Sequence, residues 1–221
     1  ERGMSMMKSS VKKIGALVAA AVMVCAIFVG CGSSKYDTST PDGALMTQLD
    51  ALKTGDFSQL EGYSKEAIEE TGFTEAQLKD LMTSLFGKST YTAQNVETVS
   101  DTEAKVTVSG KAVDMSKFIP IVSTEFLAKA TEFATKNDTT NMTAEEAQKQ
   151  VMALFIDAAK AKKSSIELKD VTVTVTMEKK DGKWDVSSDD DNMNSLTELL
   201  AGSTTEELVE SMQGLFGGSF A

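Results

Sequence analysis

The densest group of possible metal ligands is the acidic run Asp189-Asp190-Asp191, in which oxygen ligands continue through Asn194. Carboxylate and amide oxygens at alternate positions are typical of a calcium loop. A loop that begins at Asp190, however, places Ser195 where such loops need glycine and Ala201 where they need a bidentate glutamate. We therefore interpret the three carboxylates as favourable charges at a helix N-terminus, and a weak divalent-cation site is the alternative.

Three amphipathic aromatic residues are candidates for the mouth of a ligand pocket: Tyr63, Tyr91 and Trp184. Each has an apolar ring and one polar atom that seeks a hydrogen-bond partner when it is buried. The same properties suit the rim of a hydrophobic core. The three are weak ligand-binding candidates, and the identity of a ligand does not follow from them.

The residue types that are missing argue against an enzyme. The chain has no His, and its one Arg is Arg2. General acid–base and nucleophilic catalysis at neutral pH most often use His, and zinc sites use His or Cys. Anionic substrates are usually held by Arg. We therefore predict no catalytic residue, no metal and no cofactor.

The N-terminal segment predicts where the protein works. Basic Lys8, Lys12 and Lys13 precede an apolar run over 14–30, and Phe28-Val29-Gly30-Cys31 closes that run. This is the layout of a secretory signal that ends in a lipoprotein cleavage site, so we expect a lipid on Cys31. A retained transmembrane anchor is the alternative, but no basic stop-transfer cluster follows. Translation is expected to start at Met4, Met6 or Met7.

Cleavage before Cys31 has consequences for thiol chemistry and charge. Cys25 leaves with the signal and Cys31 is blocked by its lipid, so no disulfide is expected. Loss of 1–30 removes one acid and four bases from totals of 33 and 22, which leaves a net charge of −14. Because so acidic a domain repels polyanions, we exclude nucleic acid as a partner.

The chain therefore divides into four parts. Residues 1–30 are the cleaved signal peptide, 31–40 the lipidated Cys and a short tether, 41–216 a single domain, and 217–221 a flexible tail. The nine tether residues reach about 30 Å at full extension, so the domain must lie close to the membrane.

Periodicity and capping signals predict the elements of the first half. One helix begins at Thr40-Pro41, buries Leu45, Leu49 and Leu52, and ends at Gly55; a shorter helical piece over 57–68 follows. A capping box at Thr74–Gln77 opens a helix that ends at Gly87. Alternating apolar residues then predict strands over 91–99 and 103–114, with a turn at 100–102 between them.

The second half continues this mixture of helices and hairpins. We predict a helix that starts at Pro120, and a helix behind a Thr143–Glu146 capping box that buries Val151, Leu154, Phe155 and Ala158. A strand over 171–177 follows, with a bulge near Lys169-Asp170 and a hairpin turn at Asp181-Gly182. Two final helices are expected, capped at Ser195 and Thr204. The order predicts an α+β fold: a curved, mostly antiparallel sheet with helices on one face.

Four segments carry a resemblance to a known group of proteins. They are the cleavage site Phe28–Cys31, the stretch 52–57, the strand end 108–114 and the hairpin 180–186. In these segments the chain resembles small lipoproteins of Gram-positive bacteria whose domain is similar to the cystatin, nuclear-transport-factor and ketosteroid-isomerase-like cone. The resemblance implies a cavity between sheet and helices. Isomerases of that fold use a carboxylate and a tyrosine. No residue of this sequence can be matched to either of them.

Three functions stay open at this point. The first is a lipid-anchored domain on the extracytoplasmic face of the cell membrane that binds a small ligand or an envelope protein without chemistry. The second is a cone-fold isomerase or hydrolase, which would need a buried carboxylate with a raised pKa. The third is the solute-binding lipoprotein of a transporter, although such proteins usually have two lobes and longer chains.

Overall fold

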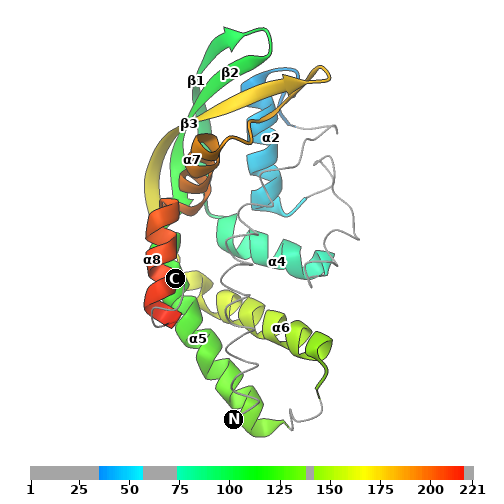
Figure 1. Ribbon diagram of the computed structural model, residues 1–221, viewed down its shortest axis with the longest axis vertical. Helices are drawn as coiled ribbons and strands as arrows, with labels where there is room; N and C mark the ends of the chain where they lie inside the picture. The colour runs from blue at the N-terminus through cyan, green and yellow to red at the C-terminus, as the bar shows by residue number, and fades with distance from the viewer. Residues whose placement is uncertain (1–34, 57–73, 138–141, 217–221) are drawn as a thin grey trace.

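The centre of the fold is an open, curved sheet of four strands (Figure 1). This computed structural model describes residues 35–56, 74–137 and 142–216. Within these ranges the strand order is β1-β2-β3-β4 and every neighbouring pair is antiparallel. The strands are β1 (Thr90–Ser100), β2 (Glu103–Val113), β3 (Leu168–Lys180) and β4 (Lys183–Val186). The predicted signal peptide and Cys31 lie outside the described residues.

Helices pack against the sheet and against one another. They are α2 (Pro41–Thr54), α4 (Glu75–Phe86), α5 (Met115–Lys136), α6 (Ala144–Lys162), α7 (Asp190–Ala201) and α8 (Thr205–Phe216), with one 3-10 turn at Lys163–Ser165. Helices α2 and α7 lie against the strands, α5 pairs with α6, and α8 packs on α5. The α+β class is therefore confirmed. In the described ranges no helix is long and apolar enough to cross a bilayer.

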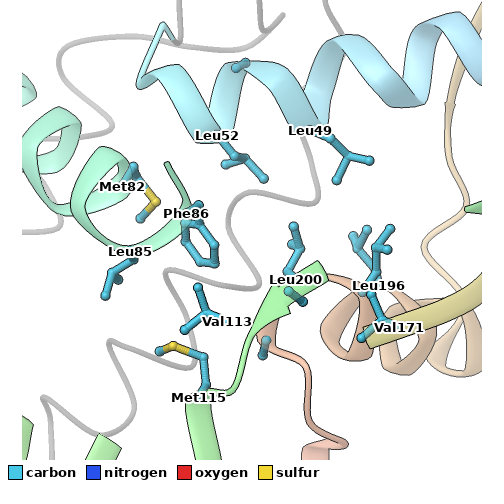
Figure 2. Packing of buried hydrophobic residues seen from close by; sticks show 14 of the residues in the cluster. Leu49, Leu52, Met82, Leu85, Phe86, Val113, Met115, Val171, Leu196 and Leu200 are labelled. Carbon is cyan, nitrogen blue, oxygen red and sulfur yellow. The ribbon is translucent and has the colours of Figure 1, made fainter. Parts of the chain in front are cut away.

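One face of the sheet is buried and the other is polar. Val106 and Val108 of β2 and Val173 and Val175 of β3 point into the core, whereas the threonines between the β3 valines are exposed. Period-two alternation of this kind places a whole strand face under the helices. Figure 2 shows the result, with side chains of α2, α4 and α7 meeting the ends of β2 and β3.

Local sequence signals place most helix ends where they were predicted. Thr40 accepts a hydrogen bond from the Gly43 N–H at 3.2 Å, and Gly55 ends α2 with φ 64°. Both predicted capping boxes form at the starts of α4 and α6. At the β3–β4 turn, Asp181 and Gly182 both have positive φ, as a two-residue hairpin requires. The helical piece predicted over 57–68 lies outside the described residues.

Helix α5 corrects the prediction that Pro120 begins a helix. Asp114 caps the helix, which starts at Met115, so Pro120 lies inside it. A proline there lacks the N–H that would bond to the Ser116 carbonyl. The Ser211 hydroxyl of α8 lies 3.2 Å from that carbonyl oxygen, and 2.8 Å from the Glu207 oxygen of its own helix. The single hydroxyl proton can donate to either oxygen, so α8 offers the Ser116 carbonyl a donor that it shares with Glu207.

Two further boundary predictions are wrong. Helix α7 is capped by Asp189 and not by Ser195, because the Asp189 carboxylate accepts the Asn192 N–H at 2.9 Å. Strand β3 pairs with β2 without interruption from Leu168, so the expected bulge near Lys169 is absent. Register shifts occur in β1 instead, at 93–95 and at 98–100.

The buried face of α6 also differs from the prediction. Ala158 is buried as predicted, together with Met152 and Ile156, whereas Val151, Leu154 and Phe155 are only partly buried. The helix packs against both α5 and α4. Contact on two sides rotates the buried stripe away from the position that a single packing partner would give.

Candidate functional site

The structure places the predicted site residues in different parts of the fold. Cys31 and Tyr63 lie outside the described residues. Tyr91 is near the start of β1, Trp184 is on β4, and the acidic run 189–191 is at the start of α7.

The hydroxyl group of Tyr91 is buried next to a second buried hydroxyl, that of Ser89. Among the described residues neither oxygen has a hydrogen-bond partner. Burial raises the pKa of Tyr91 to about 12. The nearby Ser89 hydroxyl partly opposes this rise in the pKa of Tyr91, but the two hydroxyl groups do not reach hydrogen-bond geometry. Tyr91 is therefore a neutral phenol at physiological pH, able to donate a hydrogen bond and unable to act as a base.

Trp184 and Tyr91 do not share a pocket mouth. Trp184 pairs with Lys179 of β3, whose ammonium lies 5.6 Å from the ring centroid. Tyr91 pairs with Gly110, which in turn pairs with Val171 of β3. The eight residues from Val171 to Lys179 correspond to about 26 Å of strand. Trp184 is also almost completely buried, which suits a packing role.

The acidic run begins α7. Asp189 is its N-cap, and Asp190 and Asp191 lie in its first turn. Negative side chains are favourable there because the first N–H groups of a helix are unpaired and positive. In the described part of the chain, no three His, Cys, Asp or Glu side chains come together in a way that could hold a metal ion.

A connected polar cluster lies where β3, β4 and α7 meet. We call it the α7 junction: Thr176, Glu178, Asp185, Ser187, Asp189 and Asn192. The Asn192 amide accepts the Thr176 N–H at 2.6 Å and donates to the carbonyls of Thr176 and Ser187 at 3.0 and 2.7 Å. The Asn192 side chain bonds to the edge of β3 beyond the end of β4. A further residue of β4 would otherwise pair with β3 there.

Ser187 connects two carboxylates of this junction. Its buried hydroxyl oxygen lies 2.7 Å from Glu178 Oε1 and 2.8 Å from Asp189 Oδ2. A hydroxyl has one proton, so it donates to one of them at a time. The Ser187 hydroxyl and then Lys180 lower the pKa of Glu178, and the Asn192 N–H and then Ser187 lower that of Asp189.

Asp185 behaves differently from its neighbours. It lies on β4, accepts the Val186 N–H at 2.8 Å and is 3.4 Å from Nε2 of the buried Gln48 on α2. Burial raises the pKa of Asp185, and these two hydrogen bonds partly oppose the rise. Among the described carboxylates it comes nearest to the buried acid that a cone-fold enzyme would need.

Comparison with known proteins identifies the family. A family described as a domain of unknown function (DUF5105) matches residues 38–201. The chain belongs to this family. The matched range begins just before α2 and ends at the last residue of α7, so α8 lies beyond the DUF5105 match. No curated protein matches the chain.

A solved structure similar to this DUF5105 protein is that of YcdA, a candidate lipoprotein from Bacillus subtilis subsp. subtilis str. 168. The two chains are 22% identical with a TM-score of 0.44. The similarity covers 72% of this chain and 55% of YcdA, so the chain spans about half of that protein.

In the described part of the DUF5105 domain, Asp185 and Tyr91 do not come together as the carboxylate and tyrosine of cone-fold isomerases do. Asp185 pairs with Glu178, which is seven residues along β3 from Val171, the residue in line with Tyr91. That separation is about 23 Å of strand, before the width of the sheet is added. The raised pKa of Asp185 and the neutral phenol of Tyr91 belong to separate places.

Sequence reasoning missed most of the α7 junction. Ser187 and Asn192 of the junction, and Gln48 of α2 beside it, are polar residues that are buried here, and their residue types gave no sign of it. The one local signal was the excess of capping residues from Ser187 to Ser195, which marks a helix start without saying which residue caps it. Contact of α7 with β3 determines which residue caps the helix.

Proposed function

We propose that this DUF5105 protein is a lipid-anchored domain of the extracytoplasmic face of the cell membrane, attached through Cys31, which acts by binding and without catalysis. The observation that carries the proposal is the order of basic residues, apolar run and Phe28-Val29-Gly30-Cys31. A small residue before the cysteine is what a lipoprotein signal peptidase needs, and Gly30 provides it.

The position of the first helix supports attachment close to the membrane. Helix α2 begins at Pro41, and nine residues separate it from Cys31. At about 3.3–3.6 Å per residue, this tether keeps the domain within about 30 Å of the bilayer surface. An acyl chain together with a second chain on the same residue is sufficient for stable anchoring.

The chemistry of the described residues supports binding over catalysis. After cleavage the chain has no His, Arg or free Cys. Asp185 has the raised pKa of a candidate acid, but its described polar contacts are Gln48 and the adjacent backbone. A small ligand or an envelope protein is the partner that we propose.

The experiment is metabolic labelling of the full chain with an alkyne-bearing palmitate in a Gram-positive host. We expect label on the wild type and on Cys25→Ala, which changes the cysteine that the signal removes. Cys31→Ala should carry no label and should leave the membrane fraction or retain its signal peptide. Label on Cys31→Ala, or none on the wild type, would overturn the anchor.

A further inference from the structure

The negative charge of the chain is concentrated near its C-terminus. The 38 residues from Trp184 to Ala221 contain eight Asp and Glu and no Lys or Arg, in a chain of 33 acidic and 22 basic residues. This stretch therefore carries −8 of the net charge of −14 that remains after cleavage, and the other 153 residues of the cleaved chain together carry −6.

Seven of these eight carboxylates are exposed on α7 and α8, and we call them the α7–α8 face. They are Asp189, Asp190, Asp191, Glu198, Glu206, Glu207 and Glu210. In the described part of the chain none of the seven forms an ion pair. Elsewhere lysines neutralise acids, as in the pairs Lys160–Asp80 and Lys111–Asp170. The charge of the α7–α8 face is thus not compensated by its neighbours.

We infer that the α7–α8 face points away from the membrane, and that repulsion from anionic lipids sets the orientation of the anchored domain. In Figure 1, α7 and α8 follow one another along the left side, and α2, α4 and α6 lie to the right. The inference rests on the proposed lipid anchor, because the anchor brings the domain within reach of the surface charge.

The size of the effect follows from the surface potential. At about −30 mV, an exposed carboxylate is about threefold less populated at the surface than in bulk. The effect extends over a Debye length of about 8 Å. Three such groups together therefore give a preference of roughly thirtyfold. Residues 37–40 of the tether form a hydrogen-bonded turn and Tyr36 packs against the core, so the lipid is attached close to the start of α2, and charge biases the orientation that this attachment leaves open.

The experiment measures energy transfer from single positions to a dye in the membrane. Lipidated protein is purified from membranes and reconstituted into vesicles of phosphatidylcholine, or of phosphatidylcholine with an equal part of phosphatidylglycerol. Cleavage and lipidation leave no free thiol, so Val209→Cys on α8 and Val99→Cys on β1 take one uncharged fluorophore each. Both valines are exposed, and neither change alters the charge.

We expect anionic lipid to lower the transfer efficiency from position 209 and to leave that from position 99 equal or higher. High salt should remove the difference, because the Debye length falls to about 3 Å at 1 M. Equal efficiencies from position 209 in the two kinds of vesicle would overturn the inference.

A charge variant tests the cause. Neutralising Glu198, Glu206 and Glu210 to Gln should clearly weaken the response at position 209, and the four remaining carboxylates of the face should keep part of it. The matched control neutralises Glu97→Gln, Asp101→Asn and Glu103→Gln on the β1–β2 hairpin and should keep the response. An equal effect of both triple variants would show that net charge alone matters, which also overturns the inference.

Failure of the anchor and failure of the orientation give different results. A protein without lipid on Cys31 does not enter the vesicles, and both proposals then fail. If the lipidated protein enters the vesicles and its transfer efficiency does not depend on lipid charge, the proposed anchor stands. Only the proposed orientation is then wrong.

Discussion

At the scale of single residues, the side chain of Asn192 satisfies two backbone groups of Thr176 and one of Ser187. All of these contacts are in a part of the fold where β4 has ended and α7 has begun. An asparagine amide offers both an acceptor and donors, so one side chain can replace a residue of a neighbouring strand. The helix is thereby fixed against the edge of β3.

Asn192→Ala should lower the free energy of unfolding by about 2–3 kcal/mol, because it leaves buried backbone groups without partners. Urea denaturation of the two proteins measures the difference. Asn194→Ala is the matched control, since Asn194 is exposed and, among the described residues, its side chain bonds to the Thr205 hydroxyl alone. Its cost should stay below about 1 kcal/mol. Equal costs for the two variants would contradict the role of Asn192.

Asp185 predicts a dependence of stability on pH. Its pKa is raised by burial, so the folded state binds a proton more readily than the unfolded state and charging Asp185 costs stability as pH rises from about 4. Asp185→Asn should therefore be more stable than the wild type at pH 7, by about 0.5 kcal/mol or less because the side chain is only partly buried. The oxygen acceptor for the Val186 N–H is kept.

Denaturation curves from pH 3 to pH 7 measure this difference, which should vanish at the acid end. Glu178 and Asp189 have lowered pKa values and so change stability in the opposite direction, losing it as pH falls. They are present in both proteins and cancel in the comparison. A difference that grows toward low pH would show that the sign is wrong.

At the scale of elements, the sequence predicts what is decided locally. The caps Thr40, Thr74 and Thr143 and the turn Asp181-Gly182 each depend on residues within a few positions, and each was predicted. The start of α5 was not. Asp114 has a weak local signal. Pro120 has a strong signal for a helix start, yet α5 runs through it, and the Ser211 hydroxyl, 95 residues from Ser116, lies within hydrogen-bond distance of the carbonyl that the proline cannot bond.

The strand register and the candidate site also divide into features that are decided locally and features that depend on long-range contacts. Alternation located β2 and β3, but the bulges of β1 have no residue signature and were expected in another strand. The buried polar residues of the α7 junction are set by long-range contacts. Tyr91 and Trp184 were candidates for one pocket, and only the register separates them.

A double-mutant cycle on Pro120 and Ser211 tests the long-range contact. Ser211→Ala should cost about 0.5–1 kcal/mol in the wild type, because the Ser116 carbonyl loses a donor. In a Pro120→Ala background the restored N–H should bond to that carbonyl, and the cost should fall. Ser195→Ala is the control, since the hydroxyl of Ser195 bonds to the Asp191 carbonyl of its own helix in the described structure. Additive costs would show that the two residues are not coupled.

At the scale of the whole molecule, the family match ends before the structure does. Helix α8 lies beyond residue 201, yet Leu208 is buried and Ser211 contacts the start of α5. The preceding turn is close as well, because the Ser203 hydroxyl accepts the Ser116 N–H at 3.3 Å. Helix α8 is therefore part of the folded unit.

A chain that ends after Ser203 should lose at least about 2 kcal/mol of stability, because the surface that Leu208 covers becomes exposed. Thermal unfolding, followed by circular dichroism, measures this loss. A chain that ends after Phe216 lacks only the expected tail and should melt like the full protein. Equal melting of all three chains would show that α8 contributes nothing to the fold.

The two register shifts of β1 have a consequence for proteins held on one surface. Edge strands attract other edge strands, and anchoring in a bilayer confines molecules to a plane where such encounters become frequent. Between its shifts, β1 keeps only four residues in regular register, from Asn95 to Thr98. A regular segment this short offers the strand edge of a second molecule few backbone groups to pair with. Irregularity at this edge would let a membrane carry many copies that diffuse past one another without joining into fibres.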